Sequence, residues 1–485
     1  LIKTNDVLNV ISPQDTHKIV GTVYQATENE VQQALNAAEK AKNAWANSPV
    51  NERAACLERF ADLLQQHEHE FLTLACLEAG KTLNDGVAEV REAIDFCRYY
   101  AQLARKTLAQ PHQFTGYTGE TNELSLHPRG IILCISPWNF PLAIFTGQVV
   151  AALVTGNCVI AKPAEQTPLI ASLAVTLMHQ AGIPAAAVQL LPGDGRVVGA
   201  ALVADLRIKG VLFTGSTETA TIINRTLANR GGEIVPLVAE TGGQNAMLVD
   251  SSALLEQVVV DAVTSSFGSA GQRCSALRVL FVQEEVYPRT LHLLKGAMAE
   301  LVVGAPQWLT TDVGPVIDQE ALTVLQTHVD KMKKGHEIIY QCALDESCNV
   351  GYFMPPTAIA LSNLDELERE VFGPILHVIP YKRKDLDKVI EQINNTGYGL
   401  TLGIHSRINE TVEYIRQRVH AGNCYVNRNM TGAVVGLQPF GGEGLSGTGP
   451  KAGGPNYLLR LCHERTYTVD TTAAGGNASL MSLPD

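Results

Sequence analysis

The first hundred residues carry apolar side chains at helical spacing. Val31, Ala34, Leu35 and Ala38 fall on one face of a helix. The charged residues of these segments fit a solvated opposite face, and we assign them no function. The pattern predicts a short strand pair over residues 1–23, helices over 27–45, 51–79 and about 85–106, N-caps at Thr27 and Asn51, and a C-cap at Gly80.

Residues 108–129 break this pattern with a polar stretch that predicts an exposed hairpin. An exposed pair of strands needs another sheet edge to cover it. The segment 464–469, near the end of the chain, is polar and rich in strand-forming residues. A tail strand pairing with the hairpin would complete a sheet through which two copies of the chain could form a dimer.

From Gly130 onward, short apolar runs alternate with helical segments. Such alternation is typical of an α/β fold, in which helices cover both faces of a parallel sheet. The predicted strands of this sheet are 131–135, 158–161, 188–191, 211–213 and 235–238. A second unit of strands and helices is predicted from Ala246 to about Tyr425, with a strand at 279–282 and helices at 288–301, 386–394 and 409–420.

Composition and charge narrow the function. A chain of 485 residues has room for two or three domains. Its 37 basic and 49 acidic residues give a net charge of −12, which argues against a nucleic-acid surface. The apolar runs are too short to span a bilayer. Because the chain starts at Leu1 without a signal peptide, we expect it to be a processed product or a fragment of a longer protein.

The ten cysteines form no Cys-x-x-Cys pair and no disulfide framework. Free thiols in a reducing cytoplasm fit this pattern best. His67 and His69 lie close together but without a cysteine nearby, and Glu68 and Glu70 are more simply surface charges. We therefore predict no metal site.

Polar or small residues follow each predicted strand of the parallel sheet. In open α/β sheets ligands bind at the carboxyl ends of the strands, which favours a site at this edge. The dinucleotide fingerprint Gly-x-Gly-x-x-Gly is absent. Thr214-Gly-Ser216 opens a helix and could direct backbone amides at a phosphate, although an ordinary N-cap explains it as well.

Cys274 is the strongest candidate for chemistry. Small residues at 268–271 leave space around its sulfur, and the adjacent Arg273 is a cation expected to favour the thiolate. The pattern predicts an accessible nucleophile. The alternative is a small buried hydrophobic residue, the usual role of a cytosolic cysteine.

Several motifs occurring in one order together resemble the aldehyde dehydrogenase family over nearly the whole chain. They are Ser136-Pro-Trp-Asn-Phe-Pro141, Ala161-Lys-Pro-Ala-Glu-Gln-Thr-Pro168, Phe213-Thr-Gly-Ser-Thr-Glu218, Glu240-Thr-Gly-Gly243, Gly271-Gln-Arg-Cys274, Glu370-Val-Phe-Gly-Pro374 and Pro439-Phe-Gly-Gly442. The resemblance implies a Rossmann-like NAD-binding domain, a second α/β catalytic domain and a β-hairpin and tail for oligomerisation. The implied NAD-binding domain spans residues 1–107 and 130–239, and the implied catalytic domain spans 240–430. The implied hairpin and tail are residues 108–129 and 458–485. Residues 431–457 would form an anchor loop that returns to the NAD-binding domain.

Segments 427–438 and 440–454 are similar to glutamate-semialdehyde (1-pyrroline-5-carboxylate) dehydrogenases. Segments 240–246 and 468–480 look like the C-terminal half of bifunctional proline-utilisation flavoenzymes. An N-terminal FAD-dependent proline dehydrogenase domain would then be the missing covalent partner. Gln244 replaces the lysine common in the wider family and Ala220 replaces a frequent glycine, which argues against generic aldehyde specificity.

The resemblance implies three catalytic residues. Cys274 would be the nucleophile, Asn139 would donate to the oxyanion together with the Cys274 amide, and Glu240 would be the general base for thioester hydrolysis. The simpler alternatives are a turn residue for Asn139 and a carboxylate paired with a cation for Glu240.

The implied cofactor is NAD. Lys162 and Glu165 would hold the adenosine ribose, and the Glu165 carboxylate would repel the 2′-phosphate of NADP. Ser216 would hold pyrophosphate and Glu370 the nicotinamide ribose, unless Glu370 is only a surface charge in an acidic run. The full set of implied cofactor residues is Ile135, Pro137, Trp138, Lys162, Glu165, Gly195, Gly199, Gly215, Ser216, Thr241, Gly242, Glu370 and Phe372.

The implied substrate is L-glutamate γ-semialdehyde. Ser275 and the loop amides of Gly432 and Ala433 would bind its carboxylate, and Phe140 and Phe440 would enclose its aliphatic middle. An ordinary flexible loop is the alternative for residues 432 and 433. The alternatives for function are another semialdehyde dehydrogenase, such as one for succinate semialdehyde, and an inactive scaffold that binds NAD.

Overall fold

The structure is a computed structural model, which describes residues 2–117 and 119–470. It begins with the predicted strand pair, β1 (Val7–Ser12) and β2 (Asp15–Tyr24), followed by the helices α1 (Glu28–Ala46), α2 (Val50–Gln66), α3 (Glu68–Ala79) and α4 (Leu83–Leu108). Thr27 caps α1 in a capping box with Glu30, as the sequence predicted. Gly80 ends α3 at φ 66°, a conformation that favours glycine.

The single helix predicted over residues 51–79 is wrong. The chain leaves helical geometry at His67 (φ −98°, ψ 18°), which separates α2 from α3. Both helices still bury a continuous apolar face, with Phe60 in α2 and Phe71 in α3 fully enclosed. The apolar spacing therefore stays helical across a break that it cannot reveal. Pro49, and not Asn51, precedes the first turn of α2.

The first sheet has five parallel strands, as predicted, and their order is β7-β6-β5-β8-β9. Its strands are β5 (Ile131–Ile135), β6 (Cys158–Lys162), β7 (Val188–Leu190), β8 (Ile208–Thr214) and β9 (Leu237–Glu240). The connecting helices are α5 (Ala143–Val154), α6 (Pro168–Gln180), α7 (Ala200–Ala204) and α8 (Thr217–Asn229). The strands are apolar almost throughout because helices cover both faces.

The second sheet has the order β12-β13-β14-β11-β10-β16-β17, and only the edge strand β12 is antiparallel. Its strands are β10 (Ala246–Val249), β11 (Val279–Gln283), β12 (Ile338–Gln341), β13 (Thr357–Ala360), β14 (Ile375–Tyr381), β16 (Thr401–His405) and β17 (Asn423–Val426). Its helices are α9 (Leu255–Phe267), α10 (Tyr287–Ala299), α11 (Gln319–Met332), α12 (Leu386–Asn395) and α13 (Asn409–Arg416). Two short strands, β15 (Tyr398–Gly399) and β18 (Glu443–Gly444), pair beside it.

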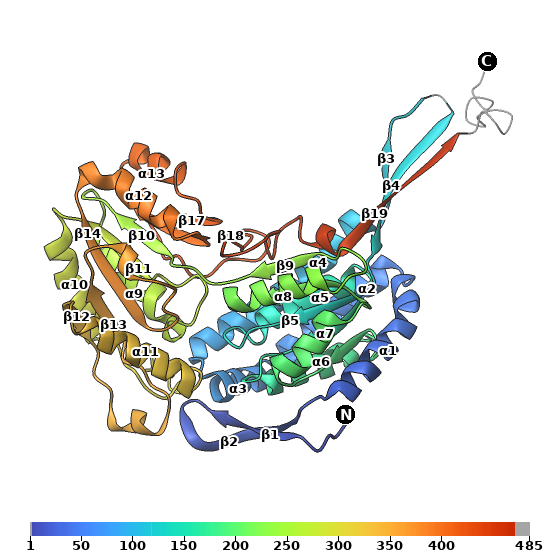
Figure 1. Cartoon of the computed structure of the whole chain (residues 1–485), viewed down its shortest axis with the longest axis horizontal. Coiled ribbons are helices and arrows are strands. Elements are labelled where there is room, and N and C mark those ends of the chain that lie inside the picture. The colour runs from blue at the N-terminus through green and yellow to red at the C-terminus, as the bar shows by residue number, and fades with distance from the viewer. Residues whose placement is uncertain (1, 118, 471–485) are drawn as a thin grey trace.

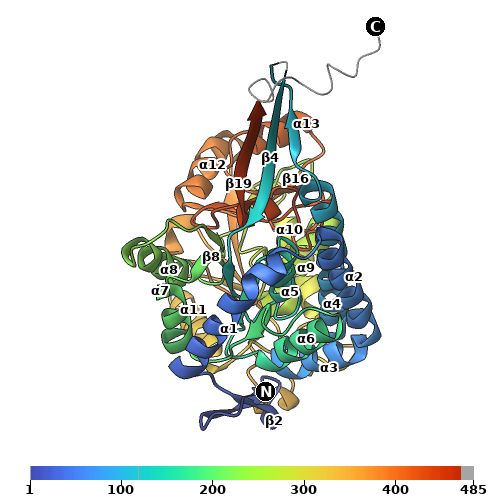
Figure 2. The ribbon, with the colours of Figure 1, turned by 90° about the vertical axis from the view of Figure 1, so that its right-hand side faces the viewer.

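A third sheet projects from the body of the molecule (Figure 1). It consists of β3 (His112–Phe114), β4 (Glu120–Pro128) and β19 (Cys462–Asp470), with β4 in the middle. The predicted pairing of the tail strand with the hairpin is confirmed, since β19 lies antiparallel to β4 from Cys462 opposite Pro128 to Asp470 opposite Glu120. Figure 2 shows the two long strands side by side. The rest of the predicted tail, 471–485, lies outside the described residues.

Two hydrophobic cores support the two larger sheets. The first includes buried residues from Ala26 to Ala239 and then Tyr457, Leu458 and Leu461, and the second extends from Ala246 to Met430. The chain passes from one core to the other directly after Glu240, the last residue of β9. Among the described helices, none combines the length and the apolar character that a membrane crossing requires.

Candidate active site

The turn that carries Cys274 has an unusual backbone. After α9 ends, Ser269 (φ 56°), Ala270 (φ 53°) and Gly271 (φ 65°) are all left-handed. A left-handed conformation costs a residue with a Cβ roughly 1–2 kcal/mol. A Cβ on Gly271 would lie 2.1 Å from the carbonyl oxygen of Gly373, so glycine is required there by a neighbouring backbone as well as by φ. The small residues before Cys274 therefore serve the geometry of the turn, beyond leaving space at the sulfur.

Cys274 is partly exposed and lies where two cavities meet. One cavity, here called the inner cavity, is lined by side chains of α4 and by the loop near residue 433. The other, the outer cavity, reaches the first turn of α8. Of the predicted residues, the inner cavity is lined by Phe140, Glu240, Thr241, Ser275, Gly432, Ala433 and Phe440, and the outer one by Pro137, Trp138, Asn139, Gly215, Ser216, Thr241, Gly242, Glu370 and Phe372. The alternative of a cysteine sealed inside a core is wrong.

The surroundings of Cys274 disfavour its charged form. Burial raises the pKa of the thiol to about 12, and the carboxylates of Glu370, Glu240 and Glu92 add to the effect. The prediction that Arg273 favours the thiolate is wrong. The Arg273 guanidinium is 2.5 Å from Asp85 and packs over the ring of Phe140, so its charge is used elsewhere. These surroundings therefore favour the neutral thiol over the thiolate.

Asn139 lies in the loop after β5, buried beside the nucleophile turn. Its side-chain nitrogen donates a hydrogen bond to the carbonyl oxygen of Gln272 at 3.0 Å. The amide has a second N–H, which this bond leaves for a ligand. The hydrogen bond to Gln272 therefore fixes the Asn139 side chain beside Cys274. Asn139 is thus more than a residue that shapes its own loop.

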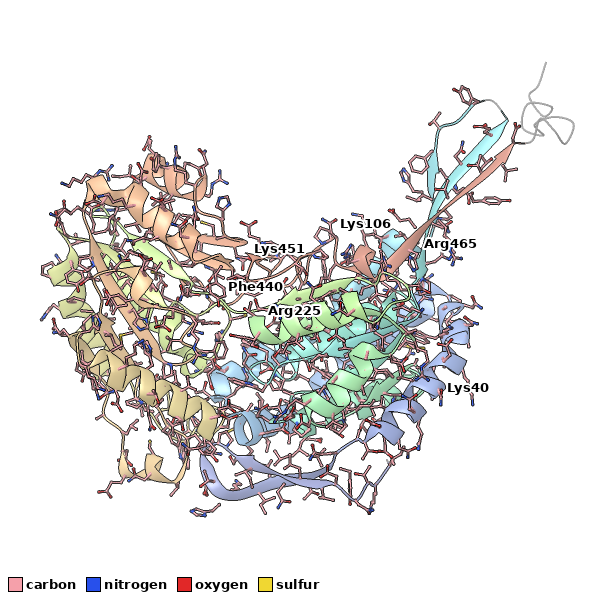
Figure 3. The ribbon with its side chains drawn as sticks, in the orientation of Figure 1. Lys40, Lys106, Arg225, Phe440, Lys451 and Arg465 are labelled. Atoms are coloured by element: carbon pink, nitrogen blue, oxygen red, sulfur yellow. The ribbon has the colours of Figure 1, made fainter. Side chains whose placement is uncertain are left out.

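Glu240 ends β9 with its carboxyl group enclosed by a glycine-rich loop. Its Oε2 accepts a hydrogen bond from the Gly442 amide at 3.1 Å, and its Oε1 is buried with no hydrogen-bond partner among the described residues. A Cβ on Gly441 or Gly447 would lie within 2.9 Å of the carboxylate oxygens. Burial raises the pKa of Glu240 to about 8, although the cation of Lys451 lowers it. Figure 3 places Lys451 and Phe440 between the two larger sheets.

Glu370 is held by Arg278, one of the largest fully buried side chains. The two groups are 3.0 Å apart, and the Glu370 side chain is only 15% exposed, against 81% for Glu368. The alternative of a surface charge is therefore wrong for Glu370. Burial raises the pKa of this carboxyl and Arg278 opposes the rise. Beside them the rings of Trp138 and Phe372 pack edge to face at 5.6 Å.

A separate group of predicted cofactor residues lies at the ends of β6 and β7. Lys162 is 3.8 Å from Glu165, and Glu165 accepts a hydrogen bond of 2.7 Å from the Gly195 amide. Gly199 lies against the Lys162 side chain. None of these four lines the outer cavity, nor does Ile135 at the end of β5, where its carbonyl accepts from Gln148. Ser216 does line it, and its hydroxyl also caps α8 by accepting from the Thr219 amide at 3.2 Å.

A family model for aldehyde dehydrogenases matches residues 2–467 of the chain. The chain belongs to the aldehyde dehydrogenase family. It is 53% identical over 464 residues to the bifunctional protein PutA of Klebsiella aerogenes, covering 94% of this chain and 34% of that protein. It is 38% identical over 473 residues to a 1-pyrroline-5-carboxylate dehydrogenase of a Geobacillus species, covering 96% of this chain and 90% of that protein.

Solved structures agree with this membership of the aldehyde dehydrogenase family. A crystal structure of a bifunctional proline utilization A protein has a TM-score of 0.91 at 54% identity, covering 93% of this chain and 46% of that one. A Thermus 1-pyrroline-5-carboxylate dehydrogenase with bound NAD has a TM-score of 0.92 at 34% identity, covering 97% and 91%. This chain spans about a third of the length of the first curated relatives that it matches.

Several residues of this aldehyde dehydrogenase site were missed from the sequence. One is Arg278, the buried partner of Glu370. Another is Asn245, whose side-chain amide donates to the carbonyls of Cys274 and Ala276 at 2.6 and 2.9 Å. Glu92 on α4 lines the inner cavity, and burial raises its pKa to about 7. Arg278 lies four residues after Cys274, and a charged residue directly before a buried strand is a signal that could have found it.

The assignment of a solvated face to every charge on the first helices is wrong. Lys81 and Glu89 are buried and 3.1 Å apart. Glu89 accepts hydrogen bonds from the amides of Leu142 and Ala143 at 2.8 and 3.3 Å, at the start of α5. Glu78 does the same for Leu169 and Ile170 at the start of α6. The carboxyl oxygens of Glu89 and Glu78 therefore accept from amides at helix N-termini, which have no partner within the helix.

Proposed function

We propose that this chain oxidises L-glutamate γ-semialdehyde, the open form of 1-pyrroline-5-carboxylate, to L-glutamate, with NAD as the hydride acceptor. The position of Cys274 at the junction of two cavities carries the proposal, because one cavity can hold an aldehyde and the other a cofactor. The names of the relatives support the substrate. The Geobacillus relative is a 1-pyrroline-5-carboxylate dehydrogenase, and the match covers 96% of this chain and 90% of that protein.

The outer cavity fits two parts of a dinucleotide, the pyrophosphate and the nicotinamide ribose. At one end the first turn of α8, with Gly215 and Ser216, presents amides that suit a pyrophosphate. At the other end the Glu370 carboxylate can accept hydrogen bonds from ribose hydroxyls beside Phe372. Lys162 and Glu165 would bind the adenosine ribose. Bound NAD would supply the acceptor for the hydride.

Cys274 would attack the aldehyde carbon and form a thiohemiacetal. Because the thiol pKa is about 12, its proton must leave as the bond to carbon forms, and a base at the site must take it. The Asn139 amide and the Cys274 backbone N–H would donate to the developing oxyanion. Loss of hydride from the same carbon leaves a thioester. Glu240, once ionised, would remove a proton from the water that hydrolyses this thioester, releasing glutamate and the free thiol.

The inner cavity suits an amino acid aldehyde. The amides of Gly432 and Ala433 and the hydroxyl of Ser275 can receive its α-carboxylate, while Phe140 and Phe440 pack against its methylenes. Glu92 lines the same cavity and, when ionised, would pair with the α-ammonium group, which would in turn stabilise its charged form. Succinate semialdehyde has no ammonium group, so Glu92 favours glutamate semialdehyde over it.

The deciding measurement is NADH formation from 1-pyrroline-5-carboxylate, with succinate semialdehyde as the comparison substrate. We expect kcat/KM to be at least tenfold higher with 1-pyrroline-5-carboxylate, since a hydrogen bond to a charged group contributes about 1.5 kcal/mol or more. The Cys274→Ala variant should bind NAD and form no NADH. Equal efficiency on both substrates would favour a broad semialdehyde dehydrogenase, and a wild type inactive on both would favour the scaffold alternative.

The setting of the enzyme belongs to the same proposal. The projecting sheet of β3, β4 and β19 would hold a homodimer together. The similarity to PutA over a third of its length supports a proline dehydrogenase domain with FAD as the covalent partner in a longer protein. All ten cysteines fall in the described ranges and are unpaired, which supports a reducing, cytoplasmic location.

A further inference from the structure

Arg278 joins the nucleophile turn to the loop that carries Glu370. Its Nη1 donates to the carbonyl oxygens of Gly271 (2.7 Å) and Gly373 (3.2 Å). Its Nη2 donates to the carbonyl of Arg273 (3.0 Å) and to Oε1 of Glu370 (3.0 Å), and its Nε is 3.3 Å from the same carboxylate oxygen. One buried guanidinium therefore contacts the residue immediately before Cys274 and the carboxylate of the outer cavity.

The carbonyls of Gly271 and Arg273 belong to a turn that needs external support. Ser269 and Ala270 have φ of 56° and 53°, a region that residues with a Cβ rarely occupy. Such conformations persist when the surroundings over-determine them. Gly271, the next residue, contacts the Gly373 backbone too closely for any side chain. Arg278 donates to both of these glycine carbonyls, so it fixes the turn against the Glu370 loop.

We propose that Arg278 is a positioning residue that locks the Cys274 turn and Glu370 into one rigid unit, so that the sulfur and the bound cofactor meet in a fixed geometry. The inference deepens the proposed oxidation and rests on it for the identity of the cofactor. It predicts a requirement for arginine specifically. A planar guanidinium has five N–H donors in a fixed fork, whereas the ammonium of lysine, with the same charge, cannot reach four acceptors in one plane.

The test compares Arg278→Lys with the wild type in two assays. In steady-state kinetics we expect kcat to fall about 10- to 100-fold, as for a misplacement on the order of 1 Å, and KM for NAD to rise. In the second assay the protein without cofactor is treated with iodoacetamide, and modification of each cysteine is followed by peptide mass spectrometry. Since the released turn no longer holds the thiol in place, we expect Cys274 alkylation to become at least fivefold faster.

Three controls separate positioning from general loosening. Cys424, the other partly exposed cysteine, lies on β17 in the same core and should react at the wild-type rate in the same sample. Arg53→Lys is the matched variant, because Arg53 is also buried and donates to the carbonyls of Val154, Ala46 and Ser48, away from both cavities. It should keep wild-type kcat and wild-type Cys274 reactivity. A thermal scan checks that each variant is folded.

Glu370→Asp keeps every charge and shortens the reach to Arg278, so it tests the same lock from the other end if Arg278→Lys does not fold. It should raise Cys274 alkylation and lower kcat, whereas Glu368→Asp at an exposed position should change neither. Wild-type kcat or wild-type Cys274 reactivity in a folded Arg278→Lys, or in Glu370→Asp, would overturn the proposal. The alkylation assay uses neither substrate nor NAD, so it remains decisive even if the wild type fails to oxidise 1-pyrroline-5-carboxylate.

Discussion

At the scale of single residues, burial sets the resting charge of both groups proposed to react. Burial raises the pKa of Cys274 and the pKa of Glu240 above their usual values, so the charged form of each group is disfavoured. The carboxylates of Glu370 and Glu240 raise the pKa of the thiol further. We therefore expect Cys274 and Glu240 to lose their protons during the reaction and not before it.

A pH profile tests Glu240 as the base. A base works in its ionised form, so the rate of thioester hydrolysis should rise with pH and level off above about 8. The Glu240→Gln variant should lose this rise, accumulate acyl-enzyme on Cys274, and still show a burst of NADH. Stopped-flow absorbance and intact-protein mass spectrometry measure the burst and the acyl group. A variant that turns over with the wild-type profile would exclude Glu240 from this step.

Cofactor choice is also decided by one residue. Glu165 accepts a hydrogen bond from Gly195 and would lie against a 2′-phosphate. Glu165→Gln keeps an oxygen acceptor and removes the charge, so kcat/KM with NADP should improve about tenfold relative to NAD. Glu218→Gln is the control. It removes a carboxylate from the first turn of α8 and should leave the ratio of kcat/KM with NADP to kcat/KM with NAD unchanged. An unaltered ratio in Glu165→Gln would disprove the charge argument.

At the scale of elements, apolar spacing predicted most of the helices and all five strands of the first sheet, because those elements bury continuous faces. It could not locate the break at His67, since the spacing remains helical on both sides. It also could not reveal Glu78 and Glu89 as buried residues, because they accept from backbone amides far along the chain, nor Lys81, which is buried as the partner of Glu89. Side chains that meet only after folding, such as Arg278 and Glu370, share no local pattern.

The Lys81–Glu89 pair should matter for stability in a way that surface pairs do not. Glu89→Ala removes the acceptor for two α5 amides and leaves Lys81 as an unpaired buried charge, at a cost of about 3–5 kcal/mol of unfolding free energy. Glu58→Ala breaks the more exposed pair with Arg105 and should cost about 1 kcal/mol or less. Urea unfolding measures both. Equal losses would show that burial of the Lys81–Glu89 pair has no special weight.

At the scale of the whole molecule, the third sheet stands apart from both cores (Figure 1). Its strands are largely exposed, including Tyr467 on β19 and Phe114 on β3. An exposed sheet with two open edges invites pairing with another chain. This arrangement is the physical basis for expecting a dimer. The polar stretch at 108–129 predicted the exposed hairpin of this sheet.

Tyr467→Asp tests that role of the third sheet. If Tyr467 is covered by a second copy, a buried charge should weaken the dimer at least about tenfold in Kd. Light scattering over a dilution series measures the change. Ile19→Asp alters a similarly exposed apolar residue on β2 and should leave the assembly intact. A wild type that is monomeric at all concentrations would remove the third sheet from consideration as an interface.

The burial that disfavours the Cys274 thiolate has a consequence under oxidative stress. Peroxides attack thiolates far faster than thiols, and eight of the ten cysteines are buried. Oxidation of Cys274 to sulfinic acid should therefore be slow while no substrate is bound. The vulnerable moment of this thiol would be confined to the brief interval of turnover in which the proton has left.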